Sequence, residues 1–113
     1  MKFKILVTAL LLSLALPAAA QFTTIAAAYE VAASDLRLPQ SESGTIAYKR
    51  CAECSYETKR VDESTVWEIN GARTTLEKFR RTVSRLENPA AETVQVLHHL
   101  DRDRVTKVWI LID

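Results

Sequence analysis

Cys51 and Cys54 are the two cysteines of the chain, and their C-x-x-C spacing suits three kinds of chemistry. Two thiolates at this spacing supply half of a tetrahedral zinc site. A dithiol at this spacing exchanges with other disulfides when its thiolate form is stabilised. In oxidised form, the pair closes a short covalent loop. The choice among these depends on the redox compartment, and therefore on whether the chain carries an export signal.

Residues 1–20 have the parts of a secretory signal peptide in the expected order. Two lysines begin it, residues 5–16 form an almost wholly apolar run, and a proline and three alanines follow. We predict cleavage between Ala20 and Gln21. The apolar run is shorter than the roughly 20 residues that a membrane span needs, so we expect a removed peptide rather than an anchor. The short, Ala-rich signal predicts a periplasmic or secreted protein.

Export favours oxidation, so we predict a structural disulfide between Cys51 and Cys54. Its four-residue loop contributes roughly 2 kcal/mol in the chain-entropy model. Thiol-disulfide exchange is the alternative. Reactive C-x-x-C pairs usually lie at a helix N-terminus, whereas residues 55–61 are strand-like and Glu53 opposes a thiolate. The alternative therefore rests on the spacing alone.

A zinc site is a third interpretation, with His98 and His99 as further ligands beside Cys51 and Cys54. Adjacent residues on a strand point to opposite faces. Only one of the two histidines can therefore join the cysteines, and the site remains a ligand short. We accordingly predict no metal and no cofactor.

The two histidines are also the candidate residues for a catalytic base. His98 shares its predicted strand face with Val94 and Val96, which is typical of a histidine at the edge of the core, and His99 faces the other way. The sequence contains no G-x-S-x-G, H-E-x-x-H or G-x-x-x-x-G-K motif. We therefore predict a chain that is not an enzyme.

Charge argues against a nucleic-acid partner. Removal of residues 1–20 from the 113-residue chain leaves 93 residues with 13 basic and 14 acidic side chains, a formal charge of −1. Nucleic-acid binding requires a basic surplus on one face. No second apolar stretch is long enough to span a membrane, so we expect no stable membrane insertion after cleavage. A protein partner of unknown identity remains the expected kind of partner.

The apolar and polar residues of the mature chain follow the pattern of a sheet protein with one helix. Strand patterns cover residues 45–50, 55–61, 65–69, 93–100 and 105–112. Asn70-Gly71 marks a tight turn. Thr74 and Glu77 fit a capping box at the start of a helix whose apolar stripe is Leu76, Phe79, Val83 and Leu86. Its other face carries Lys78, Arg80, Arg81 and Arg85, which we interpret as a solvated surface.

These patterns predict a small α+β domain over residues 44–113, in the order β-β-β-α-β-β. The expected architecture is an antiparallel sheet with one helix packed on one face. Residues 21–43 are predicted as an N-terminal arm, partly extended or flexible, after the signal peptide at residues 1–20. The functional expectation is a small soluble exported protein that acts by binding or as an accessory subunit. The runner-up is a periplasmic thiol-disulfide or metal-linked factor that uses the C-x-x-C pair.

Overall fold

The computed structural model describes residues 25–113, which form a sheet-rich domain with one α-helix. The predicted signal peptide and its cleavage point lie outside the described residues. The elements, in chain order, are β1 (Ala26–Ala32), η1 (Ala33–Asp35), β2 (Leu36–Arg37), β3 (Thr45–Tyr48), β4 (Glu57–Arg60), β5 (Val66–Ile69), β6 (Ala72–Thr74), α2 (Leu76–Ser84), η2 (Pro89–Ala91), β7 (Thr93–His99) and β8 (Arg104–Ile110). The described part of the chain has no helix that is long and apolar enough to cross a membrane.

The sheet is mixed, so the prediction of an antiparallel sheet is wrong in its finer detail. Strands follow the order β1-β7-β8-β4-β3-β2, and β5 also pairs with β8 and with β6. The pairings of β8 with β4 and with β5 are parallel, and the others are antiparallel. The physical reason is the connection from β5 to β8, because it contains α2 and β7 and so acts as a crossover that brings β8 back in the same direction.

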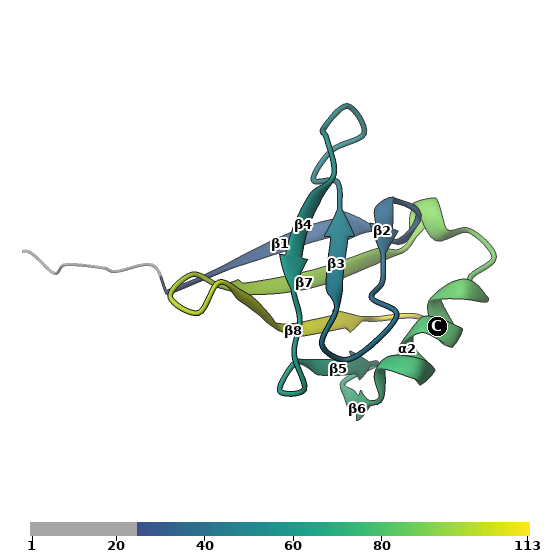
Figure 1. Cartoon of the computed structure of the whole chain (residues 1–113). Coiled ribbons are helices and arrows are strands. Elements are labelled where there is room, and N and C mark those ends of the chain that lie inside the picture. The colour runs from purple at the N-terminus through teal and green to yellow at the C-terminus, as the bar shows by residue number, and fades with distance from the viewer. Residues whose placement is uncertain (1–24) are drawn as a thin grey trace, which may run out of the picture.

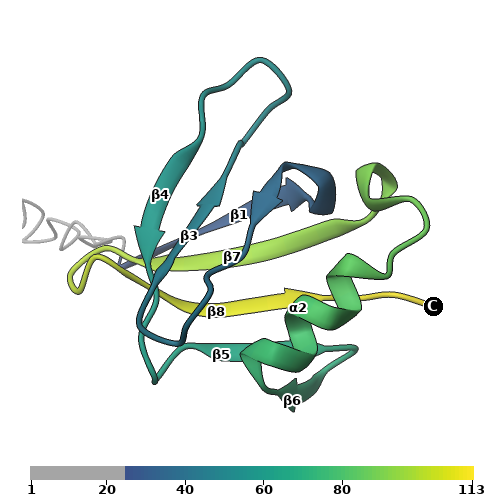
Figure 2. The same cartoon turned by 45° about the vertical axis from the view of Figure 1, so that its right-hand side comes forward.

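A bend between β4 and β5 folds the sheet over itself. Both strands pair with the edge of β8 that β7 leaves free, β4 through Arg60 and β5 through its whole length. Asp62 holds the bend by accepting hydrogen bonds from the hydroxyl and backbone N–H of Ser64, which lower the pKa of Asp62. Buried Thr65 donates to the Val105 carbonyl at 2.7 Å. As a result, β3 and β4 cross in front of β1, β7 and β8 (Figures 1 and 2).

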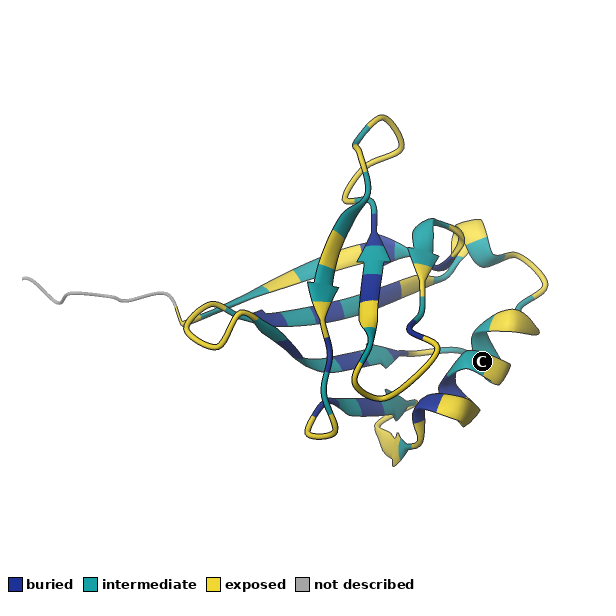
Figure 3. Cartoon of the chain, in the orientation of Figure 1, coloured by how far each residue is buried: buried dark blue, intermediate teal, exposed yellow. Residues whose placement is uncertain are grey.

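The core lies between these two parts of the sheet (Figure 3). Its members are Val31, Ala33, Ile46, Tyr48, Val61, Trp67, Leu76, Phe79, Val94, Val96, Val105, Val108 and Ile110. Val105 and Val108 are both buried, although strict alternation along β8 predicts opposite faces for them. The reason is a β-bulge opposite Leu97 and His98, where Thr106 is the extra residue and the alternation shifts by one.

The helix covers the core side of β5. Its Phe79 is fully buried and packs against Trp67, with ring centroids 5.3 Å apart. Thr75, rather than Thr74, is the N-cap, and its side chain accepts from the backbone N–H of Lys78 at 3.1 Å. The predicted capping box is therefore wrong, because the strand conformation of β6 extends through Thr74 and moves the start of the helix by one residue.

Residues 25–43 hold two strands and a short 3-10 turn, where the sequence predicts an arm. All seven residues of β1 pair with β7. Val31 and Ala33 are buried in the core, and Leu36 and Leu38 pack against it. This segment therefore supplies both terminal strands of the order β1-β7-β8-β4-β3-β2 as well as part of the core.

Candidate functional site

Cys51 and Cys54 lie at the tip of the hairpin between β3 and β4, in a loop of residues 49–56. Their Sγ atoms are at disulfide-bonding distance, and their Cα atoms are 5.0 Å apart. The backbone N–H of Cys54 donates to the Cys51 carbonyl at 3.1 Å, so the pair closes a tight turn. The nearest following element is the strand β4, and no helix begins at the pair. The geometry is that of a stapled hairpin tip.

A paired arginine and glutamate form the base of this loop. Arg50 and Glu57 make two contacts, Nε to Oε2 at 2.6 Å and Nη2 to Oε1 at 3.1 Å. The Arg50 guanidinium also lies over the ring of Tyr29, 5.2 Å from its centroid. A hollow of about 350 Å³ is lined by Arg50, Cys54, Ser55 and Glu57. The loop is thus connected to the middle of β1 through a cation–π contact.

Tyr48 lies beneath this base and is a residue that the sequence analysis did not single out. Its ring is fully buried, 5.8 Å from the ring of Tyr29. Its hydroxyl has no hydrogen-bond partner among the described residues. Burial, followed by the nearby charge of Glu57, raises the pKa of Tyr48 to about 12. Its complete burial results from the crossing of β3 over β1, which places the Tyr48 ring against Tyr29.

The two histidines are the last two residues of β7, and the turn from β7 to β8 that follows them lies away from the cysteine loop (Figure 1). His98 is 4% exposed, and its Nε2 lies 2.9 Å from Oδ1 of Asp103. His99 points to the other face, where its Nδ1 accepts from the Arg102 backbone N–H at 3.3 Å. Within residues 25–113, no three His, Cys, Asp or Glu side chains gather as a metal site would require. The fold therefore does not bring either histidine to Cys51 and Cys54.

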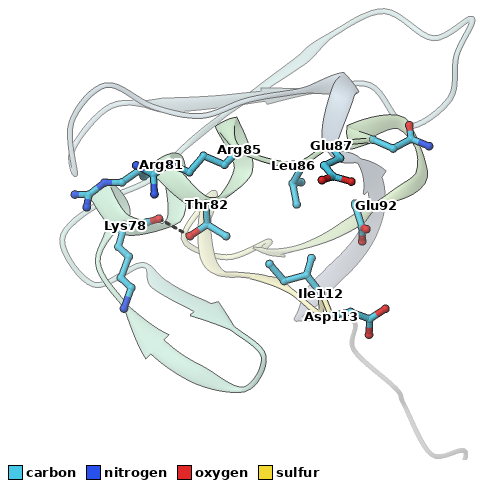
Figure 4. Close-up of a pocket in the computed structure, with 10 residues that line it drawn as sticks. Lys78, Arg81, Thr82, Arg85, Leu86, Glu87, Glu92, Ile112 and Asp113 are labelled. Carbon is cyan, nitrogen blue, oxygen red and sulfur yellow. Dashed lines mark hydrogen bonds between the residues drawn. The ribbon is translucent and has the colours of Figure 1, made fainter.

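A larger groove, of about 660 Å³, runs along the C-terminal half of α2 (Figure 4). It is lined by Lys78, Arg81, Thr82, Arg85, Leu86, Glu87, Asn88, Glu92, Ile112 and Asp113. The cations come from the helix, and the carboxylates come from the η2 loop and the residues after β8. Leu86 and Ile112 lie between the two charged groups (Figure 4). Three of the four cations on the helix face that the sequence predicted as solvated, Lys78, Arg81 and Arg85, thus form one wall of a groove.

The charges of this groove are not all used within the domain. Arg81 pairs with Glu77 one helical turn away at 3.2 Å. Lys78 and Arg85 make no ion pair among residues 25–113. They are therefore available to an anionic group that enters the groove.

Comparison with known proteins adds no relative, because no family model, curated protein or solved structure matches this chain.

Proposed function

We propose that this chain is a small exported protein that works by binding, and that the groove along α2 is its ligand site. The single observation that supports this most is the lining of the groove, with free cations on one wall and an apolar centre. Binding sites commonly combine an apolar surface with a few placed polar groups. The two histidines, by contrast, are engaged with Asp103 and with the backbone of residue 102.

The lining favours a ligand with an anionic group on an apolar body. Lys78 and Arg85 supply the cationic contacts, and charge-assisted hydrogen bonds are among the stronger ones. Leu86 and Ile112 supply the apolar contact. Glu87 and Glu92 on the opposite wall repel a second anionic group, which sets the direction in which the ligand lies.

The groove is tested with anilinonaphthalene sulfonate, a fluorescent apolar anion. We expect saturable fluorescence enhancement with the exported protein, and loss of saturation when Lys78→Glu and Arg85→Glu are combined. Arg102→Glu is the matched control, because Arg102 is exposed and lies at the β7–β8 turn, outside the groove. Equal binding by the double variant and the wild type would contradict the assignment.

Export is part of the proposal, and its support is the order of the residues before Gln21. Expression with residues 1–20 in a bacterial host, followed by mass measurement of the periplasmic and secreted fractions, tests it. A product that begins at Gln21 is the expected result. A product that keeps residues 1–20 and stays in the cell would refute it.

We propose a structural role for the Cys51–Cys54 disulfide, because the pair closes a turn at a hairpin tip. The variant Cys51→Ser with Cys54→Ser should lower the free energy of unfolding by about 2 kcal/mol. It should still bind the probe in the groove, which lies on other elements. Denaturant unfolding and the fluorescence titration measure the two effects.

Thiol-disulfide exchange is the second candidate, and the exposure of Cys51 favours it. Cys51 is exposed at the loop tip, and Cys54 lines the adjacent hollow with Arg50, whose guanidinium is paired with Glu57. Rapid reduction of the native protein by a dithiol, with a thiolate present at neutral pH, would favour this candidate over the structural role.

A further inference from the structure

The strand β1 has one edge that no other described strand uses. One edge pairs with β7 over Ala26–Ala32, and none of the strands within residues 25–113 pairs with the other. The remaining terminal strands of the sheet, β2 and β6, are two and three residues long. At seven residues, β1 is the one terminal strand in this part of the chain that is long enough to serve as a template for another strand.

The hydrogen-bond pattern identifies which backbone groups face outward. Ala33 donates to the Glu92 carbonyl at 2.8 Å, and Leu100 donates to the Ile25 carbonyl at 2.9 Å. In an antiparallel ladder, residues that point toward the partner alternate with residues that point away. Odd-numbered residues of β1 therefore face β7. The backbone N–H and C=O groups of Ala26, Ala28, Glu30 and Ala32 face the open edge.

This edge lacks the features that usually protect an exposed strand. It has no proline and no lysine, and its register with β7 runs without a bulge. Of the four residues whose backbone groups face the open edge, three are alanines. Their small side chains leave room for a neighbouring backbone. Glu30 is its single charge.

The cysteine loop restricts what can reach the edge. Arg50 lies over Tyr29 at the middle of β1, and the loop continues past β1 on the side away from β7 (Figures 1 and 2). In a symmetric antiparallel pairing of two copies through β1, each loop would project over the partner's β1, toward the place where the partner's own loop lies. A single extended peptide carries no such loop, so it is the occupant that the edge favours.

We propose that the open edge of β1 is a docking site for an extended peptide segment of another protein, which adds to the sheet as a further strand. Main-chain hydrogen bonds to Ala26, Ala28, Glu30 and Ala32 supply the affinity. Every second side chain of the peptide lies on the same face of the sheet as Tyr29. The one that pairs with Tyr29 lies on the side of the cysteine loop, and an apolar residue suits that position. This site lies on other elements than the α2 groove, so the result for one proposal does not decide the other.

The probe is a synthetic, fluorescently labelled peptide with the sequence AAAYEVA, copied from β1. When it pairs antiparallel with β1, the peptide can form hydrogen bonds with the outward backbone groups of all four residues. Its glutamate then lies opposite Ala28. We expect saturable one-to-one binding by fluorescence anisotropy, while the protein alone remains a monomer by light scattering. No binding would overturn the proposal, and so would a dimer of the protein that forms through β1.

The variant Ala28→Pro removes an outward N–H while leaving the β1–β7 hydrogen bonds in place. It should weaken peptide binding by about tenfold or more. Ala28→Val is the matched control, because it keeps the N–H and the strand preference. Equal weakening by both variants would contradict a role for the backbone edge.

Hydrogen exchange keeps the test decisive even if Ala28→Pro does not fold. In the wild-type protein, the amides of Ala26, Ala28, Glu30 and Ala32 should exchange faster than those of Ala27, Tyr29 and Val31. The peptide should slow the first group and leave the second unchanged. Binding without this change at the even-numbered amides would refute the edge as the site.

Discussion

At the residue scale, Tyr48 is a side chain whose burial changes its chemistry from that in water. A buried hydroxyl without a partner costs free energy, whereas an apolar replacement of the same shape removes that cost. The hydroxyl has no described partner, and the pKa of Tyr48 is raised to about 12, mainly by burial. Folding therefore favours the protonated form of this phenol.

We predict that Tyr48→Phe leaves the free energy of unfolding at neutral pH unchanged or raises it by up to about 1 kcal/mol. Because the pKa in the folded state is above the unfolded value, the contribution of Tyr48 to stability is complete below pH 10 and is lost as pH rises toward about 12. The variant should lack this alkaline loss. Urea unfolding from neutral to alkaline pH measures it. Tyr56→Phe serves as the control and should retain the loss.

At the element scale, the start of α2 depends on a choice between two adjacent threonines. Either can act as a cap by residue type, and the sequence favoured Thr74 because Glu77 follows three residues later. The hairpin of β5 and β6 decides otherwise, because Thr74 pairs with Trp67 as the last residue of β6. Thr75 then receives the extended backbone conformation of an N-cap, with φ −91° and ψ 158°.

We predict that Thr75→Ala lowers the free energy of unfolding by about 1 kcal/mol, because the Lys78 N–H loses its acceptor. Thr74→Ala is the matched control and should have the smaller effect. Thermal or urea unfolding of the two variants side by side gives the comparison. A larger loss in Thr74→Ala would mean that the helix begins one residue earlier.

At the scale of the whole molecule, the N-terminal segment and the C-terminal hairpin form one sheet. Val31 in β1 is 1% exposed and is opposite Val94 in β7. The core thus draws on residues from both ends of the described chain. The α2 groove is likewise built from segments far apart in the sequence, since the helix, the η2 loop and the residues after β8 all line it.

We therefore predict that Val31→Ala destabilises the entire domain, by about 2 kcal/mol, rather than loosening β1 alone. The expected observation is a single cooperative unfolding transition that moves to lower denaturant concentration. Ala28→Val, on the exposed side of the same strand, should leave the transition nearly unchanged. Persistence of the wild-type transition in Val31→Ala would show that β1 is not integral to the fold.

Much of the local structure follows from the sequence alone, because it depends on neighbouring residues. The apolar period placed α2, β5, β7 and β8 close to their observed positions, and Asn70-Gly71 forms the predicted turn, with φ of 52° and 82°. The C-x-x-C spacing left a disulfide, an exchanging dithiol and a zinc site open, and the predicted export signal favoured the disulfide. The short turn brings the two cysteines together without help from the rest of the chain.

Tertiary structure alone decided how these pieces meet. The parallel pairing of β5 with β8 and the pairing of β1 with β7 join segments far apart in the sequence, which no local pattern specifies. The same is true of the buried Tyr48 hydroxyl, of the groove along α2 and of the open edge beneath the cysteine loop. A strand's alternation records which residues face the core, but it does not record which strand lies beside it. That choice depends on how the whole chain buries its apolar surface.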